Sequence, residues 1–366
     1  MIEVKGKFNT AKIFTDNVES GAIDQIRTLL DQEWMKDSKV RVMPDVHEGA
    51  GCTIGTTFTI SDKIVSNLVG VDIGCGMETV YLQEHDIDLK KLDEVIHKYI
   101  PSGFNVRDTP HEFNSKINID DLVCAKDVKV DRAKLSLGTL GGGNHFIEVD
   151  KDYLGNLHLV IHSGSRNIGQ NTAIWYQQKA IKTCTEKGIR KDLAYLEGKY
   201  FDDYLHDMKI MQEYADLNRK AMVDVILDKM NLNSIRQFTT THNYIDLKNN
   251  ILRKGAVSAQ EGEELLVPIN MRDGAIIATG KGNSDWNYSS PHGAGRLMSR
   301  GDAKRKFKME DFIESMRGIY STSVNQSTLD ESPMAYKPMD EILKNVEPTL
   351  KIDKIIKPIY NFKAAE

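Results

Sequence analysis

Gly70-Val-Asp-Ile-Gly-Cys-Gly-Met77 places a carboxylate, Asp72, three residues before a thiol, Cys75. The glycines in this stretch let the backbone turn tightly, so that a carboxylate oxygen and a sulfur can reach one point. A carboxylate and a thiolate together suit a borderline divalent metal such as Mn, Co, Fe or Zn. The stretch therefore predicts a metal-binding loop around which the rest of the chain is organised.

Three histidines lie in loops rich in glycine, serine or asparagine, each at the end of an expected strand. They are His145, His162 and His242. A lone histidine is more often structural than a ligand, but these three accompany the carboxylate and the thiol of the 70–77 loop. One thiolate, one carboxylate and three imidazoles exceed a single tetrahedral site. The set favours two metal ions that share the Cys75 sulfur, an arrangement suited to phosphoryl transfer.

Other residues beside these histidines suit a nucleotide or a phosphate. Three consecutive glycines precede Asn144, and they allow the backbone to approach a phosphate or a purine closely. Asn144 and Glu148 can read the polar edge of a base or a ribose. His162 is followed by Ser163 and, on a glycine turn, by Arg166, which is a metal-plus-phosphate pattern.

His292 stands apart from the metal-ligand candidates. It directly precedes Gly-Ala-Gly-Arg296, and Arg300 follows four residues later. A helix that begins near residue 294 would turn its amide groups and both arginines toward a phosphate. Because a neutral imidazole nitrogen can attack phosphorus and form a phosphoramidate, His292 is the candidate nucleophile.

Composition limits the function classes. The 366-residue chain can bury one large core or two smaller ones, and ligand loops spread from residue 45 to residue 300 favour one domain, 1–366. No apolar run approaches the roughly 18 residues of a membrane span, and residues 1–14 lack an apolar signal region. Four cysteines without paired spacing predict reduced thiols in a cytoplasmic protein. The net charge of −5 means that RNA binding would need a local basic patch, such as 300–308.

Five motifs together are very specific: Asp-x-x-Cys-Gly from 72, Gly-Gly-Gly-Asn-His-Phe-x-Glu to 148, His-Ser-Gly-Ser-Arg to 166, Thr-His-Asn at 241–243 and His-Gly-Ala-Gly-Arg to 296. The combination resembles the RtcB-type RNA ligases, the 3′-phosphate RNA ligases of tRNA splicing and RNA repair. The final Asn-Phe-Lys363 matches the C-terminal lysine of that family. The resemblance implies an α+β fold, with mixed β-sheets of a single domain around a central metal pocket and helices outside.

The resemblance also implies residue roles. Asp72 and Cys75 would bind two Mn²⁺ ions, with His145 on the Asp72 ion and with His162 and His242 on the other. His292 would take GMP from GTP, and the arginines at 166 and 296 would meet RNA phosphates. The guanylate would lie among Asn144, His145, Phe146, Ile147, Glu148, His242, Asn243, Pro268, Ile269, Asn270, Met271, Ala275, His292, Gly293, Ala294, Gly295 and Lys363.

The implied reaction is a GTP- and Mn-dependent ligation. A 2′,3′-cyclic phosphate end is opened to a 3′-phosphate, His292 passes GMP to it, and a 5′-hydroxyl RNA end displaces GMP from the RNA-3′-pp-G intermediate. A monomer and an activating protein partner are both compatible with this scheme. Two alternatives are a metal-dependent phosphodiesterase or phosphatase on RNA ends and a non-catalytic RNA-binding protein. The presence of both His292 and Lys363 favours the ligase over the first, and a complete ligand set favours it over the second.

Overall fold

The computed structural model describes residues 1–364, and it confirms the α+β class. Most strands belong to a six-stranded and a seven-stranded sheet. The six-stranded sheet runs β1 (Ile2–Lys5), β2 (Thr10–Ile13), β3 (Val40–His47), β4 (Ile54–Thr59), β12 (Ile251–Lys254), β11 (Asn243–Asp246). The seven-stranded sheet runs β10 (Ser234–Thr241), β6 (Gly76–Leu82), β8 (Leu157–Ser163), β7 (Phe146–Lys151), β17 (Leu350–Lys363), β15 (Gly274–Gly280), β14 (Glu264–Asn270). Short ladders join β13 (Ala256–Ser258) to β16 (Ser289–Pro291) and β5 (Lys63–Ile64) to β9 (Leu196–Glu197).

The central strands β6, β7 and β8 of the seven-stranded sheet are buried on both faces. Along β7, Ile147 and Val149 pack with the helices α2 (Leu89–Tyr99) and α5 (Lys199–Met230), whereas Phe146 on the other face joins a cluster with Leu266 of β14. That second cluster spans strands far apart in the sheet order, so the sheet curls until its edge strands β10 and β14 approach. The amide of Leu266 donates to Thr240 Oγ1 across this gap at 3.0 Å. The concave side of the curl holds the candidate site.

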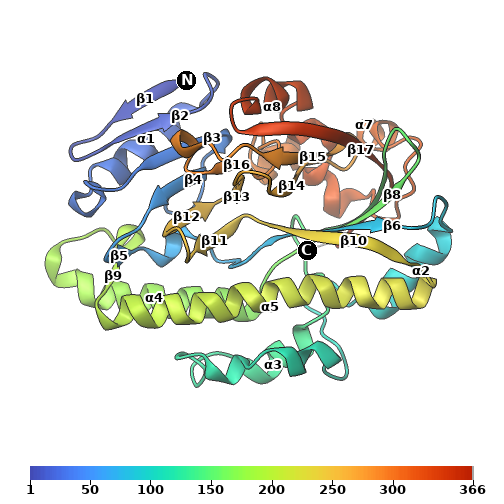
Figure 1. The fold of residues 1–366 in the computed structure, drawn as a ribbon, viewed down its shortest axis with the longest axis horizontal. Helices are drawn as coiled ribbons and strands as arrows, with labels where there is room; N and C mark the ends of the chain where they lie inside the picture. Colours follow the sequence, from blue (N-terminus) through green and yellow to red (C-terminus); the bar gives the residue numbers. More distant parts are fainter. Residues whose placement is uncertain (365–366) are drawn as a thin grey trace.

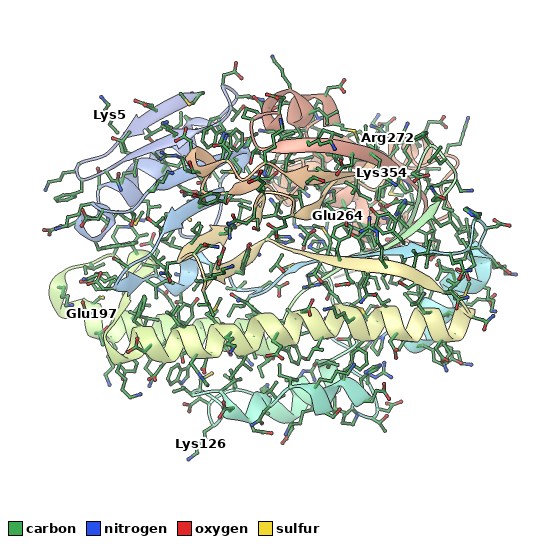
Figure 2. All side chains as sticks on the ribbon, viewed as in Figure 1. Lys5, Lys126, Glu197, Glu264, Arg272 and Lys354 are labelled. Atoms are coloured by element: carbon green, nitrogen blue, oxygen red, sulfur yellow. The ribbon has the colours of Figure 1, made fainter. Side chains whose placement is uncertain are left out.

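Helices cover the outer faces of the sheets (Figure 1). The 32-residue α5 lies along the seven-stranded sheet, with α4 beside it and α3 on their outer side. Charged side chains such as Lys5, Lys126 and Arg272 lie at the periphery (Figure 2). None of the helices in residues 1–364 is long and apolar enough to cross a membrane. The helices are α1 (Ser20–Leu30), α2 (Leu89–Tyr99), α3 (Val130–Ser136), α4 (Arg166–Cys184), α5 (Lys199–Met230), α6 (Arg300–Lys306), α7 (Met309–Ser315) and α8 (Met339–Val346).

The two large sheets meet at His242, which links β10 of one sheet to β11 of the other. The amide of His242 donates to the Cys75 carbonyl at 2.9 Å, and its own carbonyl accepts from Ala256 at 3.2 Å. The loop of Cys75 therefore sits at the junction of the sheets, where strand ends from both converge.

The expected helix near residue 294 is wrong. Residues 292–299 form a loop, and α6 begins only at Arg300. Gly295 adopts φ +77°, and a Cβ there would lie 2.6 Å from the Asp45 carbonyl oxygen. This close approach of β3 requires an extended segment with a left-handed glycine, which a helix could not provide.

We predict that Gly274→Ala destabilises the protein more than Gly155→Ala. Both glycines have positive φ, but an added Cβ at Gly274 would lie 2.0 Å from the Ile356 carbonyl oxygen, whereas nothing lies within 4 Å at Gly155. Backbone strain alone costs about 1 kcal/mol at Gly155, and the clash raises the loss at Gly274 to about 3 kcal/mol. Melting temperatures of the two variants test this, and equal values would contradict it.

Candidate active site

The candidate metal ligands come from strand ends that the sheet register brings together. Asp72 and Cys75 lie in the loop before β6, His145 directly precedes β7, and His162 is the penultimate residue of β8. Met77 of β6 and Phe146 of β7 are both register partners of His162 on the intervening β8. Strand pairing therefore brings Asp72, Cys75, His145 and His162 together at the same end of neighbouring strands. His242 joins them from the junction between the two sheets.

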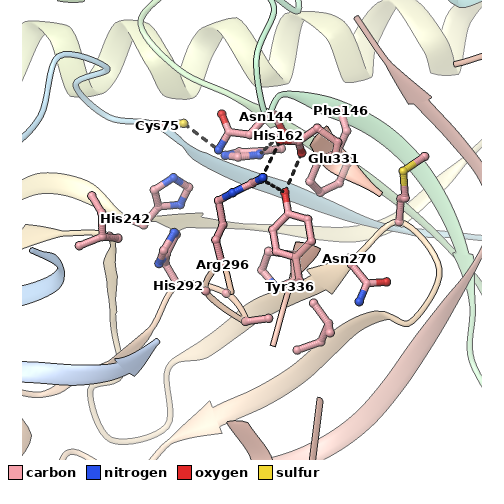
Figure 3. A pocket seen from close by; sticks show the side chains of 18 of the residues that line it. Cys75, Asn144, Phe146, His162, His242, Asn270, His292, Arg296, Glu331 and Tyr336 are labelled. Carbon is pink, nitrogen blue, oxygen red and sulfur yellow. Dashed lines mark hydrogen bonds and ion pairs between the residues drawn. The ribbon is translucent and has the colours of Figure 1, made fainter. Parts of the chain in front are cut away.

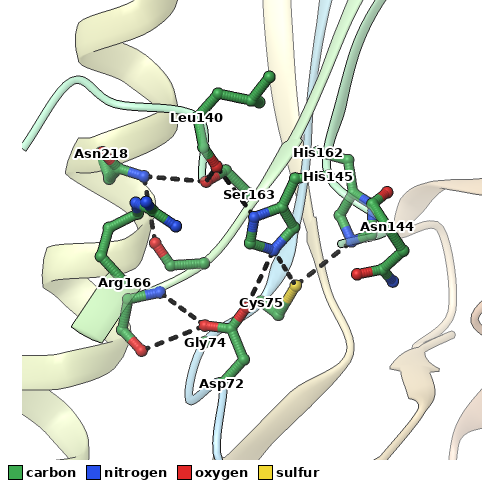
Figure 4. A network of polar contacts seen from close by, with 12 residues as sticks. Asp72, Gly74, Cys75, Leu140, Asn144, His145, His162, Ser163, Arg166 and Asn218 are labelled. Carbon is green, nitrogen blue, oxygen red and sulfur yellow. Dashed lines mark hydrogen bonds and ion pairs between the residues drawn. The ribbon is translucent and has the colours of Figure 1, made fainter. Parts of the chain in front are cut away.

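The ligand atoms converge on the Cys75 sulfur (Figure 4). Sγ lies 3.5 Å from His145 Nε2 and 3.3 Å from His162 Nε2, and Asp72 Oδ2 lies 2.9 Å from His145 Nε2. Two groups of donor atoms result, each within 4.8 Å: Asp72, Cys75 and His145 in one, Cys75, His162 and His242 in the other. The sulfur belongs to both groups, which is the position that a bridging thiolate would need.

Hydrogen bonds to backbone carbonyls orient two of these imidazoles. His145 Nδ1 donates to the Leu140 carbonyl at 2.9 Å, and His162 Nδ1 donates to the Asn144 carbonyl at 3.1 Å. A carbonyl only accepts, so each Nδ1 carries a proton, and the neutral His162 ring turns its Nε2 lone pair to the sulfur. Burial, with the neighbouring imidazoles, lowers the pKa of His162 and His242 well below the usual value, so both rings are neutral.

The charges around this cluster fit a bound cation. Burial by itself would raise the pKa of Asp72, but a proton that His145 Nε2 donates to the carboxylate at 2.9 Å outweighs it and lowers that pKa to about 2. A bound cation would take the place of that proton. Burial and the Asp72 charge raise the pKa of the Cys75 thiol. Nδ1 of His242 is buried and has no hydrogen-bond partner within residues 1–364. An ionised carboxylate, neutral imidazoles and a buried thiol are the donors that a borderline divalent ion takes, so the residues fit the metal predicted from the sequence.

A cavity of about 340 Å³ opens beside the ligands (Figure 3). It brings together most of the residues predicted to surround a guanylate. Ile147 and Ala275 are exceptions, because their side chains pack in apolar clusters, and His145 reaches the site through its contacts with Asp72 and Cys75. The predicted residues that line the cavity are Asp72, Cys75, Asn144, Phe146, Glu148, His162, His242, Asn243, Pro268, Ile269, Asn270, Met271, His292, Gly293, Ala294, Gly295, Arg296 and Lys363.

His292 is held by a residue that the sequence reasoning did not include in the site. Its Nδ1 lies 2.6 Å from Oδ2 of Asp45, a fully buried carboxylate 247 residues away in the chain. The same oxygen accepts the backbone amide of His292 at 3.2 Å. Since the carboxylate fixes the proton on Nδ1, the Nε2 lone pair is left for the cavity that the ring lines. The crowding of Asp45, His47 and Glu48 at a strand end was the only sequence signal for Asp45.

A second buried carboxylate, Glu331, also escaped the sequence reasoning. Its oxygens lie 2.7 Å from Lys363 Nζ, 2.6 Å from Arg300 Nη1 and 2.7 Å from the Tyr336 hydroxyl. Burial would raise the pKa of Glu331, but the charges of Lys363 and Arg300 lower it to about 2. Arg296, a predicted RNA-phosphate contact, also lies against this carboxylate, at 3.2 Å (Figure 3). The chain around Glu331 carries no sequence motif that would have marked it.

Arg166 lies on the other side of Asp72. It lines a second cavity of about 700 Å³, which also includes Lys129, Arg132 and the Asp72 carboxylate. Its Nη2 donates to the Gly103 carbonyl at 2.9 Å. The two arginines predicted to contact RNA phosphates thus lie in different cavities, which share Asp72.

Comparison with known proteins supports the motif-based resemblance. The family model described as tRNA-splicing ligase RtcB matches residues 25–364. The chain belongs to the RtcB family.

Curated members of the RtcB family align with most of the chain. The RNA-splicing ligase RtcB of Escherichia coli K12 is 34% identical over 350 residues, covering 83% of this chain and 85% of that protein. The tRNA-splicing ligase RtcB of Aeropyrum pernix is 28% identical over 399 residues, covering 82% of each chain. The tRNA-splicing ligase RtcB of Archaeoglobus fulgidus is 25% identical, covering 93% of this chain and 90% of its own. The RtcB-family resemblance predicted from the motifs is thereby confirmed.

We predict that Cys75→Ala abolishes paired metal binding, because the sulfur belongs to both ligand groups. Elemental analysis after dialysis against Mn²⁺ should show a fall from about two ions per chain to fewer than one. Cys184→Ala is the matched control, since that thiol is equally buried and only donates to the Tyr195 carbonyl. Unchanged metal content in Cys75→Ala would exclude a bridging sulfur.

Proposed function

We propose that this chain is a GTP- and Mn²⁺-dependent RNA ligase that joins 2′,3′-cyclic phosphate or 3′-phosphate RNA ends to 5′-hydroxyl RNA ends. Membership of the RtcB family supports ligation of RNA. The observation that carries the mechanism is the Asp45–His292 contact beside the two ligand groups. It leaves one imidazole nitrogen of the cavity with a fixed lone pair and outside both metal-ligand groups.

His292 is the proposed nucleophile. Its Nε2 attacks the α-phosphorus of GTP, a P–N bond forms, and the bond from that phosphorus to the pyrophosphate oxygen breaks. The ring gains positive charge as the bond forms, and the Asp45 carboxylate on Nδ1 offsets it. Two metal ions, held by the ligand groups around Cys75, would neutralise phosphate charge that otherwise repels the attacking groups.

Two residues that line the cavity favour guanine over adenine. Lys363 presents an ammonium donor and Glu148 a carboxylate acceptor, and both line the cavity. Guanine carries an acceptor at O6 and a donor at N2, whereas adenine carries an N6 donor. Glu331 holds Lys363 at one end of this pair, and Asn361 donates to Glu148 at the other. The Lys363 donor therefore suits guanine O6, and the Glu148 acceptor suits guanine N2.

The remaining steps transfer GMP and then release it. Water opens the cyclic phosphate, breaking the bond to O2′, which takes a proton. An oxygen of the resulting 3′-phosphate attacks the phosphorus on His292 and frees the imidazole. The 5′-hydroxyl oxygen of the second strand attacks the 3′-phosphorus, loses its proton, and GMP leaves. Arg166 and Arg296 would hold RNA phosphates from the two cavities that meet at Asp72.

We further propose that residues 1–366 act as one catalytic domain, because both large sheets supply site residues. A monomer then suffices for the reaction, with or without an activating protein partner. The second candidate function is a metal-dependent phosphodiesterase or phosphatase on RNA ends. That reaction would use the ligands around Cys75, but the Asp45–His292 contact would have no role in it.

Incubation with [α-³²P]GTP and Mn²⁺ tests the proposal. Wild type should carry a label that survives a denaturing gel, resists alkali and is lost in acid, as a phosphoramidate requires. His292→Ala should carry none while its metal content stays unchanged. A wild-type protein that binds metal and releases cyclic phosphate from RNA ends without any label would favour the phosphodiesterase.

Asp45→Asn should slow labelling by GTP on the order of 10²- to 10⁴-fold, because the amide no longer offsets charge on the His292 ring. Transfer kinetics with limiting GTP measure this rate. Asp285→Asn is the control, since Asp285 pairs with Lys12 and Arg41 outside the cavity. Equal rates for wild type and Asp45→Asn would remove Asp45 from the mechanism.

A further inference from the structure

Two adjacent polar residues of α5, Asn218 and Arg219, are fully buried behind the metal-ligand loops. Neither belongs to a ligand group or lines the cavity. Burying an arginine and an asparagine side by side in a helix is unfavourable unless their hydrogen bonds are used. Most of their partners are backbone groups of the segments that carry the candidate ligands. Figure 4 shows Asn218 beside these segments.

Arg219 joins two ligand segments through one nitrogen. Its Nη1 donates to the Gly74 carbonyl at 2.8 Å and to the Ser163 carbonyl at 2.9 Å. Gly74 immediately precedes Cys75, and Ser163 immediately follows His162. The guanidinium therefore sets the separation between the shared sulfur and one imidazole of the second ligand group.

Asn218 holds the segment that leads to His145. Its Oδ1 accepts the amides of Gly138 and Thr139 at 2.8 and 3.1 Å, and its Nδ2 lies 3.1 Å from Ser163 Oγ. That hydroxyl donates to the Leu140 carbonyl at 2.8 Å, the same carbonyl that accepts from His145 Nδ1. The hydrogen bonds run without a break from α5 to the imidazole of the first ligand group (Figure 4).

The metal-binding loop rests directly on this helix. Gly74 has φ +71°, and a Cβ there would lie 2.8 Å from Cβ of Ala215 and 3.1 Å from Cα of Gln212. Only glycine allows such an approach. The loop is therefore held against α5 by this close contact and by the hydrogen bond from Arg219 to the Gly74 carbonyl.

We propose that Asn218 and Arg219 form a positioning pair that fixes the two ligand groups relative to each other, so that two divalent ions bind together. This inference rests on the proposed two-ion centre. Arg219 secures the Cys75–His162 group, Asn218 secures the His145 side, and their adjacency in one helix turn ties both groups to a single rigid element. A substitution that removes hydrogen bonds of either residue lowers the affinity for the second ion more than the affinity for the first.

Mn²⁺ titration of the metal-free protein tests the pair, read by isothermal calorimetry and by the spin-coupled Mn signal in electron paramagnetic resonance. Arg219→Lys keeps the positive charge, but its ammonium ends one bond short of the Nη1 position that donates to both carbonyls. Affinity for the second ion should fall about 10- to 100-fold, the usual effect of a residue that orients ligands, and the coupled signal should fade. Asn218→Asp, which keeps the acceptor but loses the Nδ2 donor, should act in the same direction.

Arg253→Lys is the matched control. Arg253 is the other fully buried arginine among the described residues. It donates to Ser289 Oγ and to the Tyr244 hydroxyl, both at 2.8 Å. Its substitution should lower the melting temperature and leave both Mn²⁺ affinities unchanged. Should Arg219→Lys fail to fold, Asn218→Asp alone decides the matter.

The outcomes separate the inference from the proposed function. Two coupled ions in wild type with unchanged affinities in Arg219→Lys and Asn218→Asp would overturn the positioning pair and leave the ligase proposal standing. An equal loss of affinity for the second ion in Arg253→Lys would show a general destabilisation of the fold. That result would also contradict the positioning role of Asn218 and Arg219. Fewer than two ions in wild type would contradict the two-ion centre and, with it, the inference.

Discussion

The convergence of nitrogen and oxygen lone pairs on the buried sulfur of Cys75 is the constraint on which the rest of the structure depends. His145 and His162 turn Nε2 toward that sulfur from two different strands, and Asp72 meets His145 from a loop. Acceptors that face one another out of water repel and lose solvation, so such a cluster is unfavourable without a proton or a cation between them. The surrounding fold must therefore hold the cluster in place by contacts that the cluster itself does not supply.

Those contacts come from regular structure. Pairing of β6, β7 and β8 aligns the strand ends, and the curl of the seven-stranded sheet creates a concave face beside them. On the opposite side, α5 packs against β6 and β8 and brings polar side chains to the loop carbonyls. Backbone carbonyls in turn fix the protons of His145 and His162. The ligand atoms are thus oriented by hydrogen bonds whose partners are themselves held in strands and a long helix.

Two buried carboxylates organise the cavity beside this cluster. Asp45 holds His292, and Glu331 gathers Lys363, Arg296 and Arg300. Each carboxylate lies far along the chain from most of its partners, and each has its negative charge compensated by donors in the interior. One carboxylate therefore fixes a ring nitrogen, while the other holds a set of cations that line the same cavity.

The sequence by itself indicated the candidate metal-binding loop at 70–77, its five candidate ligands and His292, because glycine turns and chemically unusual side chains at strand ends are local signals. The family resemblance of its motifs implied the α+β class, which the structure confirms, and pointed to Lys363. Only the tertiary structure decided which residues support them. The sequence led to a helix near residue 294, whereas contact with the β3 backbone forces Gly295 into a left-handed loop. Asp45 contacts His292 across 247 residues, Arg219 contacts Gly74 across 145 and Glu331 contacts Lys363 across 32. No local pattern encodes contacts that strand pairing and helix packing bring about.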